Sequence, residues 1–396
     1  MKGKSKGQSI IGANRIDSNT NQPQNCKRAV LLGAGHAHLH TIRHAARFTR
    51  RGQELLLIAP GPFWYSGLAT GMLGGRYPPE QDQVDVAALI GRGGGRFLQG
   101  LARAINPKSR TVQLEEGPPL RYDVLSVNLG SEVPEGLVPG LVEHGSAVKP
   151  ISNLWRLREA LEDRFRSSGP GAPVRIVVVG GGASGCEVSA NLRRLAEDRG
   201  GVAEITLLSS GDRLLEGLPE RASAGVVRSF RDRGIVIRSK ARADRVEPGE
   251  VILDDGLRLP FDVLVASIGL VPPPILGRSG LPTDDRGALL VDDHLRSLAD
   301  PLVFGGGDCI ALQGRPLARI GVYAIRQAPV LLHNLLATLE GQGRPLRRFR
   351  PQSRFLLILN LGDGTGLATW GPFHWQGRLA FRWKDWIDRR FLSKYR

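Results

Sequence analysis

The stretch that decides the fold reads Arg175-Ile-Val-Val-Val-Gly180-Gly-Gly182-Ala-Ser-Gly185, and an earlier stretch, Arg28-Ala-Val-Leu-Leu-Gly33-Ala-Gly35-His-Ala-His38, repeats its plan. Each combines an apolar strand, a glycine-rich turn and the start of a helix. The first glycine of such a turn permits a tight bend, and the second lets the backbone approach a pyrophosphate. The following helix directs free N–H groups and a positive dipole end at the phosphates. Two such loops in one chain predict two dinucleotide sites.

The two loops match the dinucleotide pattern to different degrees. The later loop has a third glycine, Gly185, which allows the helix to pack closely on the strand. The earlier loop has His38 at that position and is therefore the weaker match. An ordinary glycine-containing turn between a strand and a helix is the alternative interpretation, and it applies more to the first loop than to the pair.

The composition is that of a globular protein with an unusual charge. A length of 396 residues predicts two or three domains, and a hydrophobic content of 41% is enough for real cores. The formal net charge of +16 indicates an anionic partner, which could be a nucleic acid, a nucleotide or a membrane. Because no zinc-finger spacing or RNA-binding signature accompanies this charge, we do not expect a nucleic-acid partner.

Cysteine usage and hydropathy indicate the compartment. The three cysteines, Cys26, Cys186 and Cys309, form no Cys-x-x-Cys pair, which fits a reducing compartment and gives no local dithiol relay. No stretch reaches the ~18 apolar residues of a membrane-spanning helix. The N-terminus lacks the apolar core of a secretion signal. We therefore expect a cytoplasmic protein, with attachment to the inner face of a membrane as an open alternative.

An internal similarity between two stretches of the sequence predicts the domain organisation. The stretch 122–131 and the stretch 261–269 are both apolar strands that end in glycine, and each closes one of the glycine-loop units. This predicts an α/β protein with two Rossmann-like, three-layer ββα domains, the second inserted in the first, and a C-terminal α+β region. The expected parts are a disordered tail (1–26), a discontinuous first domain (27–149 and 268–338), a second domain (150–267) and a β-rich region that ends in a basic amphipathic helix (339–396).

Several short stretches outside the strands carry a family pattern. They are Gly35-His-Ala-His38, Tyr65-Ser-Gly67, Asn128-Leu-Gly-Ser131, Val148-Lys-Pro-Ile151, Gly180 to Glu187, Gly307-Asp-Cys309, Ala324-Ile-Arg-Gln327 and Trp383-Lys-Asp-Trp-Ile-Asp388. With them the chain resembles the pyridine nucleotide–disulfide oxidoreductase superfamily, and within it the type II NADH:quinone oxidoreductase-like proteins. It resembles most the flavoprotein module found fused ahead of selenophosphate synthetase. The kinase part of that fusion is not in this sequence, so no selenide-phosphorylating activity is implied.

The resemblance implies a set of cofactor-binding residues. It places FAD on the first domain and NADH or NADPH on the second, with Asp308 accepting a hydroxyl of the FAD sugar chain. Glu187 matches a family acid near the nicotinamide. The implied cofactor-binding residues are Gly33, Ala34, Gly35, His36, Ala37, Gly130, Ser131, Gly307 and Asp308 for FAD, and Gly180, Gly182, Ser184, Gly185, Glu187 and Gly269 in and after the second loop unit.

The resemblance also implies where electrons leave the flavin. Tyr323 and Gln327 lie on the segment that runs beneath the isoalloxazine ring in the family, and they would face the electron acceptor. Lys149 would approach the flavin, where a cation favours the anionic reduced form. The alternative for Lys149 is a solvated linker lysine.

Each unit departs from the pattern at the end of its second strand. An acid usually holds a ribose 2′-hydroxyl there, but the chain has Ala59-Pro60 in the first unit and Ser209-Ser210 in the second. NADH and NADPH therefore both remain open. Arg213 could meet a 2′-phosphate, or it could be an ordinary surface arginine. A nucleotide domain that has lost its ligand is a further alternative.

Two residue clusters could carry other chemistry. His36, His38, His40 and His44 have helical spacing, but no cysteine or carboxylate nearby completes a set of ligands, so we expect no metal. Cys186 follows the second loop, where a helix N-terminus could lower its pKa, but we favour a packing role. Cys309 follows Asp308, and a thiol beside a flavin would suit sulfur or selenium chemistry.

The C-terminal helix has an amphipathic pattern. Trp383, Trp386, Ile387 and Phe391 fall on one face of the helix expected over 381–395, and basic residues, Lys384 among them, surround them. Aromatic and basic residues in this arrangement suit the headgroup zone of an anionic membrane, and residues 381–396 are the expected contact. The alternative is a helix that docks on its own protein or on a second copy in a homodimer.

Together these observations predict an FAD-dependent NAD(P)H dehydrogenase. Hydride would pass from the nicotinamide to the flavin, and a quinone or another small acceptor would collect the electrons. One alternative is a flavoprotein that reduces or oxidises sulfur or selenium compounds. Another is a nucleotide-binding partner protein without catalytic activity.

Overall fold

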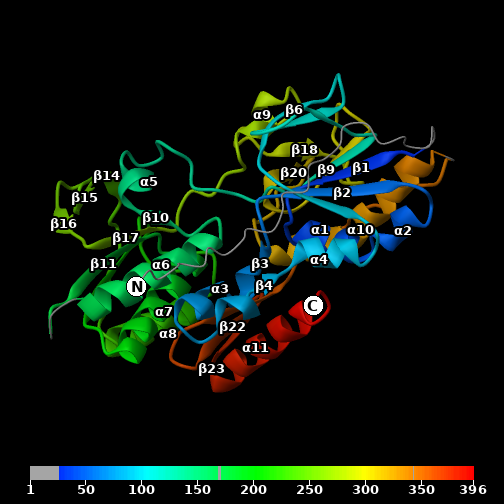
Figure 1. The fold of residues 1–396 in the computed structure, drawn as a ribbon. Coiled ribbons are helices and arrows are strands. Elements are labelled where there is room, and N and C mark those ends of the chain that lie inside the picture. The colour runs from blue at the N-terminus through cyan, green and yellow to red at the C-terminus, as the bar shows by residue number, and fades with distance from the viewer. Residues whose placement is uncertain (1–25, 168–170, 342) are drawn as a thin grey trace, which may run out of the picture.

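The computed structural model describes residues 26–167, 171–341 and 343–396. Residues 1–25 of the expected tail lie outside the described residues, as do 168–170 and 342. Figure 1 shows two parallel sheets, each with its own helices, and the C-terminal helix running below the region between them.

The first sheet is parallel and has the strand order β19-β9-β1-β2-β5. Its strands are β1 (Arg28–Leu32), β2 (Glu54–Ala59), β5 (Arg96–Gln99), β9 (Val124–Val127) and β19 (Val303–Gly305). The central strands form from continuous apolar runs because other layers of the domain cover both faces of the parallel sheet. The pairing of Phe304 with Ser126 brings the segment after the second domain back to β9, so the second domain is inserted in the first.

The second sheet repeats this plan with the order β10-β17-β11-β12-β13. Its strands are β10 (Ser146–Ala147), β11 (Val174–Val179), β12 (Ala203–Leu208), β13 (Ile235–Arg238) and β17 (Val263–Ala266). In each domain an antiparallel meander forms the third layer. The meanders are β6 (Ala102–Asn106), β7 (Thr111–Leu114) and β8 (Leu120–Arg121), and β14 (Ala243–Glu247), β15 (Glu250–Leu253) and β16 (Arg258–Pro260). The predicted fold class is confirmed.

Helices and short elements complete the two domains. In the first, these are α1 (His36–Arg43), α2 (Ala46–Thr49), β3 (Phe63–Trp64), α3 (Ser66–Leu73), η1 (Pro79–Gln81), β4 (Gln83–Val84), α4 (Val86–Gly91), α9 (Ile275–Arg278), β18 (Leu289–Val291), η2 (Gly307–Cys309), β20 (Ile310–Leu312) and α10 (Gly321–Glu340). In the second, they are α5 (Leu141–His144), α6 (Ser152–Ser167), α7 (Ala183–Arg199) and α8 (Glu220–Asp232). Helices α1 and α10 pack against each other.

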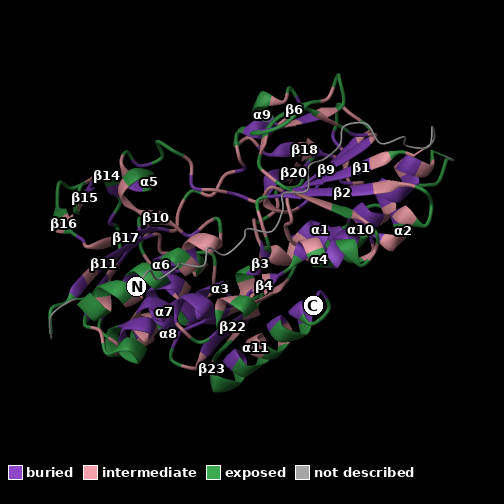
Figure 2. Cartoon of the chain, viewed as in Figure 1, coloured by how far each residue is buried: buried purple, intermediate pink, exposed green. Residues whose placement is uncertain are grey.

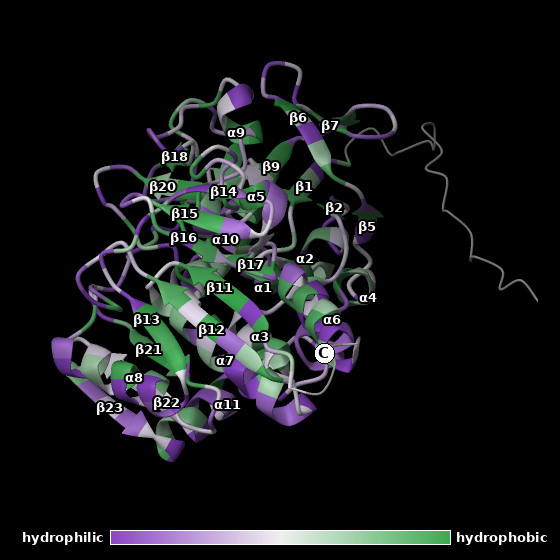
Figure 3. Ribbon diagram, turned by 90° about the vertical axis from the view of Figure 1, so that its left-hand side faces the viewer, coloured by the Kyte–Doolittle hydropathy of each residue, from purple (hydrophilic) through white to green (hydrophobic). Residues whose placement is uncertain are grey.

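The C-terminal region is a small antiparallel sheet crossed by a helix. Strands β21 (Leu356–Asn360), β22 (Gly366–Trp370) and β23 (Phe373–Gly377) pair in chain order, and α11 (Arg378–Leu392) packs on them and on α3. Figure 2 shows the sheet strands and α7 as buried, whereas much of α11 is exposed. In Figure 3 the strands of the second sheet are hydrophobic, and polar residues alternate along the outer helices α8 and α11.

A buried arginine joins α6 to the first domain. Arg158 donates hydrogen bonds to the backbone carbonyls of Met72 at 2.9 Å and Tyr77 at 3.1 Å, and its Nε donates to Glu162 at 2.8 Å. Only 8% of Arg158 is exposed. These carbonyls belong to the end of α3 and the loop after it, so one side chain satisfies polar groups of two domains.

We predict that Arg158→Ala destabilises the protein by about 2–4 kcal/mol, because it leaves the buried carbonyl groups of Met72 and Tyr77 without this partner. The measurement is the midpoint of urea unfolding followed by circular dichroism. The control is Arg166→Ala on the same helix, whose ion pair with Asp163 is exposed and is worth about 0–1 kcal/mol. Equal midpoints for the two variants would contradict the role given to Arg158.

Candidate functional site

The first glycine loop closes around the side chain of Asn128. A Cβ on Gly33 would lie 2.4 Å from the Asn128 carbonyl oxygen, and one on Gly35 would lie 2.3 Å from its Oδ1. Asn128 Oδ1 accepts a hydrogen bond from the Ala37 N–H at 3.0 Å, and its Nδ2 donates to the Gly306 carbonyl at 2.6 Å. The loop therefore requires glycine at both positions because Asn128 occupies the space.

The histidine that replaces the third glycine is fully buried. His38 Nδ1 lies 2.6 Å from the Gly33 carbonyl oxygen, and Nε2 lies 2.8 Å from Ser126 Oγ. Burial lowers the pKa of His38 to about 4, so the ring is neutral. A neutral ring that donates from Nδ1 to the carbonyl accepts from Ser126 at Nε2. His38 thus joins the loop to β9 by hydrogen bonds where a glycine would permit close packing.

The second loop has the closer packing that its glycines predict. Gly180 has φ +125°, and a Cβ on Gly185 would lie 1.8 Å from the Gly180 carbonyl oxygen. Within the described residues, neither α1 nor α7 has a side-chain cap at its first turn, where Gly35 and Gly182 are the N-cap residues. Uncapped N–H groups at these two helix ends are available to phosphate oxygens. Ala34 and Ser184 lie on the same turns.

Each domain has a hollow at the equivalent place, beside its edge strand and the loop after its second strand. The residues around the first hollow are Gly61, Pro62, Gln83, Asp85, Val86, Ala87, Phe97 and Gln99. Those around the second are Asp212, Arg213, Leu214, Val227, Arg231, Gly234, Ile235, Val236, Ile237 and Ser239. Ligands of doubly wound sheets bind outside the carboxyl ends of the strands. Neither hollow includes a residue of the glycine loops, so the fit to two dinucleotides rests on the loops themselves.

Asp308 forms a buried ion pair at the end of the first domain. Its Oδ2 accepts from Lys149 Nζ at 2.5 Å and from Ser131 Oγ at 2.9 Å. Burial disfavours the ionised form of Asp308, but the Lys149 ammonium and these hydrogen bonds outweigh it and lower the pKa of the carboxyl. The structure thus brings together three of the expected residues, and Lys149 is not a solvated linker residue. Gly130 precedes Ser131 with φ +74°.

The start of α10 holds the two residues expected at the acceptor. Gln327 is 1% exposed, and its Oε1 accepts from the Gly307 N–H at 2.7 Å. Tyr323 donates from its hydroxyl to the Gln352 carbonyl at 3.2 Å. Gly321 lies beside His36, because a Cβ there would be 3.6 Å from His36 Nε2. The helix N-terminus therefore meets the first glycine loop.

A cluster of charged side chains lies beneath α11. Lys384 Nζ donates to Asp388 Oδ2 at 2.7 Å and to the Gly67 carbonyl at 2.5 Å, and Tyr65 donates to Asp388 Oδ1 at 2.8 Å. Burial lowers the affinity of Lys384 for its proton, but Asp388 and Glu187 outweigh this and raise the pKa of Lys384. We name these residues, with Asp82, the α11 cluster.

Glu187 brings the second domain into the same cluster. Its Oε1 accepts from the Asn360 N–H at 2.6 Å and from Thr70 Oγ1 at 3.5 Å. Burial raises the pKa of Glu187, although nearby Lys384 opposes the rise. The sequence pattern identifies Glu187 as a candidate but does not show the roles of Tyr65, Lys384 and Asp388. The available signal was the pair of matched stretches 65–67 and 383–388, whose polar residues come into contact only in the folded chain.

The C-terminal helix differs from the expected amphipathic pattern. Phe391 is buried and stacks on Tyr65 with ring centroids 4.8 Å apart, and Lys384 points into the cluster, not out to solvent. The expectation that both belong to the outer face is wrong. Trp383 and Trp386 do face outwards, with 40% and 55% exposed. The aromatic stripe is divided because α11 packs both on the sheet of β21, β22 and β23 and on α3.

The cysteines and the arginine considered for other roles are structural. Burial raises the pKa of Cys186 and of Cys309 to about 12, so neither is a thiolate. The guanidinium of Arg213 donates to backbone carbonyls of the loop that follows it, those of Leu214, Leu215, Glu216 and Leu218. Arg213 therefore holds its own loop. Gly269 has φ +64° and lies against the side chain of Leu137.

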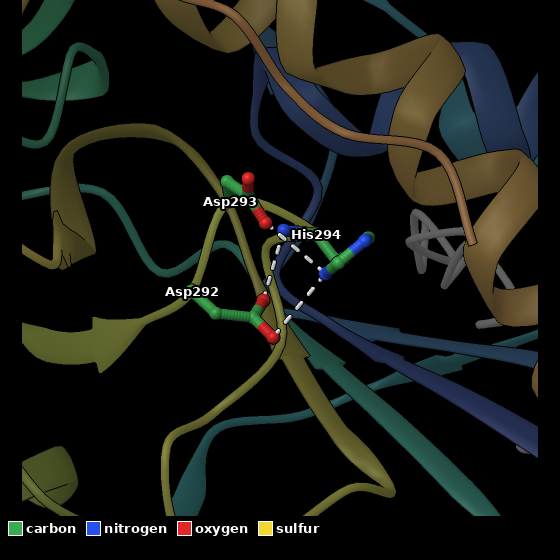
Figure 4. A group of neighbouring side chains, drawn as sticks. All are labelled: Asp292, Asp293 and His294. Carbon is green, nitrogen blue, oxygen red and sulfur yellow. Dashed lines mark hydrogen bonds and ion pairs between the residues drawn. The ribbon is translucent and has the colours of Figure 1, made fainter.

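A group of side chains after β18 has the composition of a metal site. Among the described residues, the one group of three potential metal ligands is Asp292, Asp293 and His294, shown in Figure 4. Its carboxylates already pair with arginines, Asp292 with Arg296 at 3.2 Å and Asp293 with Arg348 at 3.4 Å. These partners neutralise the charge that a cation would need.

Comparison with known proteins gives a consistent picture. Residues 27–330 match the family model described as pyridine nucleotide-disulphide oxidoreductase. The type II NADH:quinone oxidoreductase of Haemophilus influenzae is 28% identical over 363 residues, which cover 79% of this chain and 80% of the relative.

Solved structures share the fold. NDH2 from Plasmodium falciparum in complex with NADH has a TM-score of 0.78 at 14% identity, covering 93% of this chain and 98% of that one. The sulfide:quinone oxidoreductase from Aquifex aeolicus has a TM-score of 0.77 at 18% identity, covering 94% and 92%. The finer resemblance to the module fused to selenophosphate synthetase stays a prediction.

We predict that Gly185→Ala destabilises the protein by about 1–3 kcal/mol, because the new methyl group forces α7 away from the Gly180 carbonyl. Gly182→Ala is the matched control. No described atom lies within 4 Å of the Cβ that it adds, and the backbone there has φ −78°. Thermal unfolding of both variants is the measurement, and equal melting temperatures would contradict the packing role of Gly185.

Proposed function

Because the chain belongs to the pyridine nucleotide-disulphide oxidoreductase family, we propose that it is an FAD-dependent NAD(P)H dehydrogenase that passes electrons to a quinone. The observation that carries the proposal is the pair of phosphate cradles, formed by Gly33 and Gly35 in one domain and by Gly180 and Gly185 in the other. The type II NADH:quinone oxidoreductase of Haemophilus influenzae supports the choice of acceptor.

The first domain fits FAD. The uncapped N–H groups at the start of α1 can bind a pyrophosphate, and ionised Asp308 can accept a hydrogen bond from a sugar hydroxyl. Lys149 keeps Asp308 in that ionised form and holds its carboxylate in place. Bound FAD would supply the two-electron chemistry, which amino-acid side chains lack.

The second domain fits the nicotinamide nucleotide. Gly180 and Gly185 shape the turn, and the first turn of α7 offers N–H groups to the phosphates. Ser209 takes the usual place of the ribose-binding acid, and its Oγ lies 2.3 Å from where a Cβ on Gly181 would be. Without a carboxylate at that position, both NADH and NADPH are candidate donors.

The surface around α11 fits attachment to an anionic membrane, which is where a quinone would be found. Its exposed aromatic and apolar residues are Trp370, Phe373, Trp375, Leu379, Trp383 and Trp386. Arg378, Arg382, Arg389 and Arg390 lie on the same helix. None of the helices in the described ranges has both the length and the apolar character needed to cross a membrane. Formation of a homodimer through this surface stays an alternative.

Sulfur or selenium chemistry is the second enzymatic candidate, but the buried thiol of Cys309 gives it little support. Its Sγ accepts from the Leu129 N–H at 3.4 Å and donates to the Gly306 carbonyl at 3.4 Å. A cysteine relay requires an accessible thiolate, and this thiol is neither accessible nor ionised.

Anaerobic titration of the purified protein tests the proposal. We expect NADH or NADPH to bleach the flavin absorbance promptly, and a soluble quinone analogue to restore it. A bound flavin that neither nucleotide reduces would contradict the dehydrogenase proposal. Reduction without reoxidation by the quinone would leave a dehydrogenase with a different acceptor.

Membrane attachment has its own test. Combined Trp383→Ser and Trp386→Ser substitutions should weaken binding to anionic phospholipid vesicles at least about tenfold, because each indole loses about 1.5–3 kcal/mol of apolar burial. Sedimentation with vesicles is the measurement. Leu257→Ser, at an exposed position between β15 and β16, is the control. Unchanged sedimentation of the double variant would favour docking of this face on protein.

A further inference from the structure

A buried carboxyl group beneath α11 has no hydrogen-bond partner among the described residues. Asp82, between η1 and β4, is 0% exposed, and within the described residues neither of its carboxylate oxygens has a hydrogen-bond partner. Its backbone carbonyl accepts from the Tyr65 N–H at 2.8 Å, so its position beside the cluster is fixed. A buried, unpaired carboxylate is very costly, and such a group keeps its proton instead.

The charged and polar groups around Asp82 form hydrogen bonds with other residues. Lys384 and Tyr65 both hydrogen-bond to Asp388, at 2.7 Å and 2.8 Å. Arg396, the other cation near Asp82, donates to the Glu80 and Gln81 carbonyls. The α11 cluster therefore holds three carboxyl groups, those of Asp82, Glu187 and Asp388, around one buried ammonium group. With Arg396 counted as the second cation, three carboxylates leave one negative charge, which one proton balances.

The cluster adjoins the place expected for electron transfer. Lys384 Nζ donates to the Gly67 carbonyl at 2.5 Å. The preceding residue, Ser66, lies with His36 beside Gly321, since both side chains are within 4 Å of the position of a Cβ there. This is where the first glycine loop and the N-terminus of α10 meet. Lys384 thus contacts the residue next to Ser66, which lies at the acceptor end of the site.

We propose that Asp82 carries a proton in the resting protein and releases it when the acceptor is reduced. This inference rests on the proposed function. Reduction of a quinone follows NAD(P)H + H⁺ + quinone → NAD(P)⁺ + quinol. The nicotinamide supplies two electrons and one proton as hydride, and the second proton comes from the Asp82 O–H bond. Water then returns a proton to the Asp82 carboxylate.

The electrostatic surroundings agree with this role. Burial, reinforced by Asp388, raises the pKa of Asp82 from 3.8 to about 9, and Lys384 and Arg396 oppose the rise only in part. The folded protein therefore binds a proton there that the unfolded chain releases. Stability from this group is complete below pH 3.8 and is lost as the pH rises towards 9.

Infrared spectroscopy of the holoprotein tests the proton directly. At pH 7 the wild-type protein should show the carbonyl stretch of a protonated carboxylic acid, which shifts in D₂O. Asp82→Asn should lose that band, and Asp82→Glu should move it. Asp163→Asn, which removes an exposed carboxylate, should leave the band unchanged. An identical acid band in wild type and Asp82→Asn would overturn the proposal.

Kinetics test the release of the proton. Asp82→Asn should lower the rate of quinone reduction at least about tenfold, because positioned proton donors typically contribute about 10²–10⁴-fold. It should also remove the alkaline limb of the pH profile of that rate. Asp82→Glu should restore both, whereas flavin reduction by NAD(P)H should be unchanged in each variant. A pH profile that Asp82→Asn leaves intact would overturn the inference. Failure of wild-type flavin reduction would instead count against the proposed function, and the infrared bands would still decide whether Asp82 is protonated.

Discussion

One amide side chain holds the first domain together. Asn128, at the end of β9, accepts from the N–H of Ala37 on α1 and donates to the carbonyl of Gly306 after β19. A Cβ at Gly35 or Gly307 would lie 2.3 Å from a side-chain atom of Asn128, and one at Gly33 would lie 2.4 Å from its backbone carbonyl oxygen. The glycines that shape the phosphate cradle and those of the returning turn are thus consequences of the same contact.

The second domain has the same architecture, but its glycine loop is not held by a side chain in the way that Asn128 holds the first loop. Its loop is held by direct packing, with Gly185 against the Gly180 carbonyl and Ser209 against Gly181. The first loop reaches the same shape through the hydrogen bonds of Asn128 and His38. Two structural solutions therefore support one function, that of bringing backbone N–H groups close to phosphates. This explains why one loop tolerates an imidazole at a position where the other requires glycine.

Local sequence patterns predicted the fold well and the site only in part. The glycine loops and the apolar strand runs are local signals, so the two domains and the insertion could be predicted from Gly33, Gly180 and their flanking strands. The α11 cluster could not be predicted in this way, because Tyr65 and Asp388 are 323 residues apart and meet only when α11 packs on α3. Likewise, the helical periodicity of 381–395 does not show that Phe391 turns inwards. Tertiary packing decides which face of a helix with apolar residues all round is buried.

The insertion of one domain into the other has a consequence for folding during synthesis. The hydrogen bonds of Asn128 are complete only after Gly306 has been synthesised, and Gly306 lies 178 residues later in the chain. The second domain is continuous, and its sheet can close while the first remains open. Contacts of such long sequence separation slow folding, and domains fold as units during translation. The inner domain is therefore expected to form first and to bring the ends of the outer one together, so that the contacts of Asn128 are completed last.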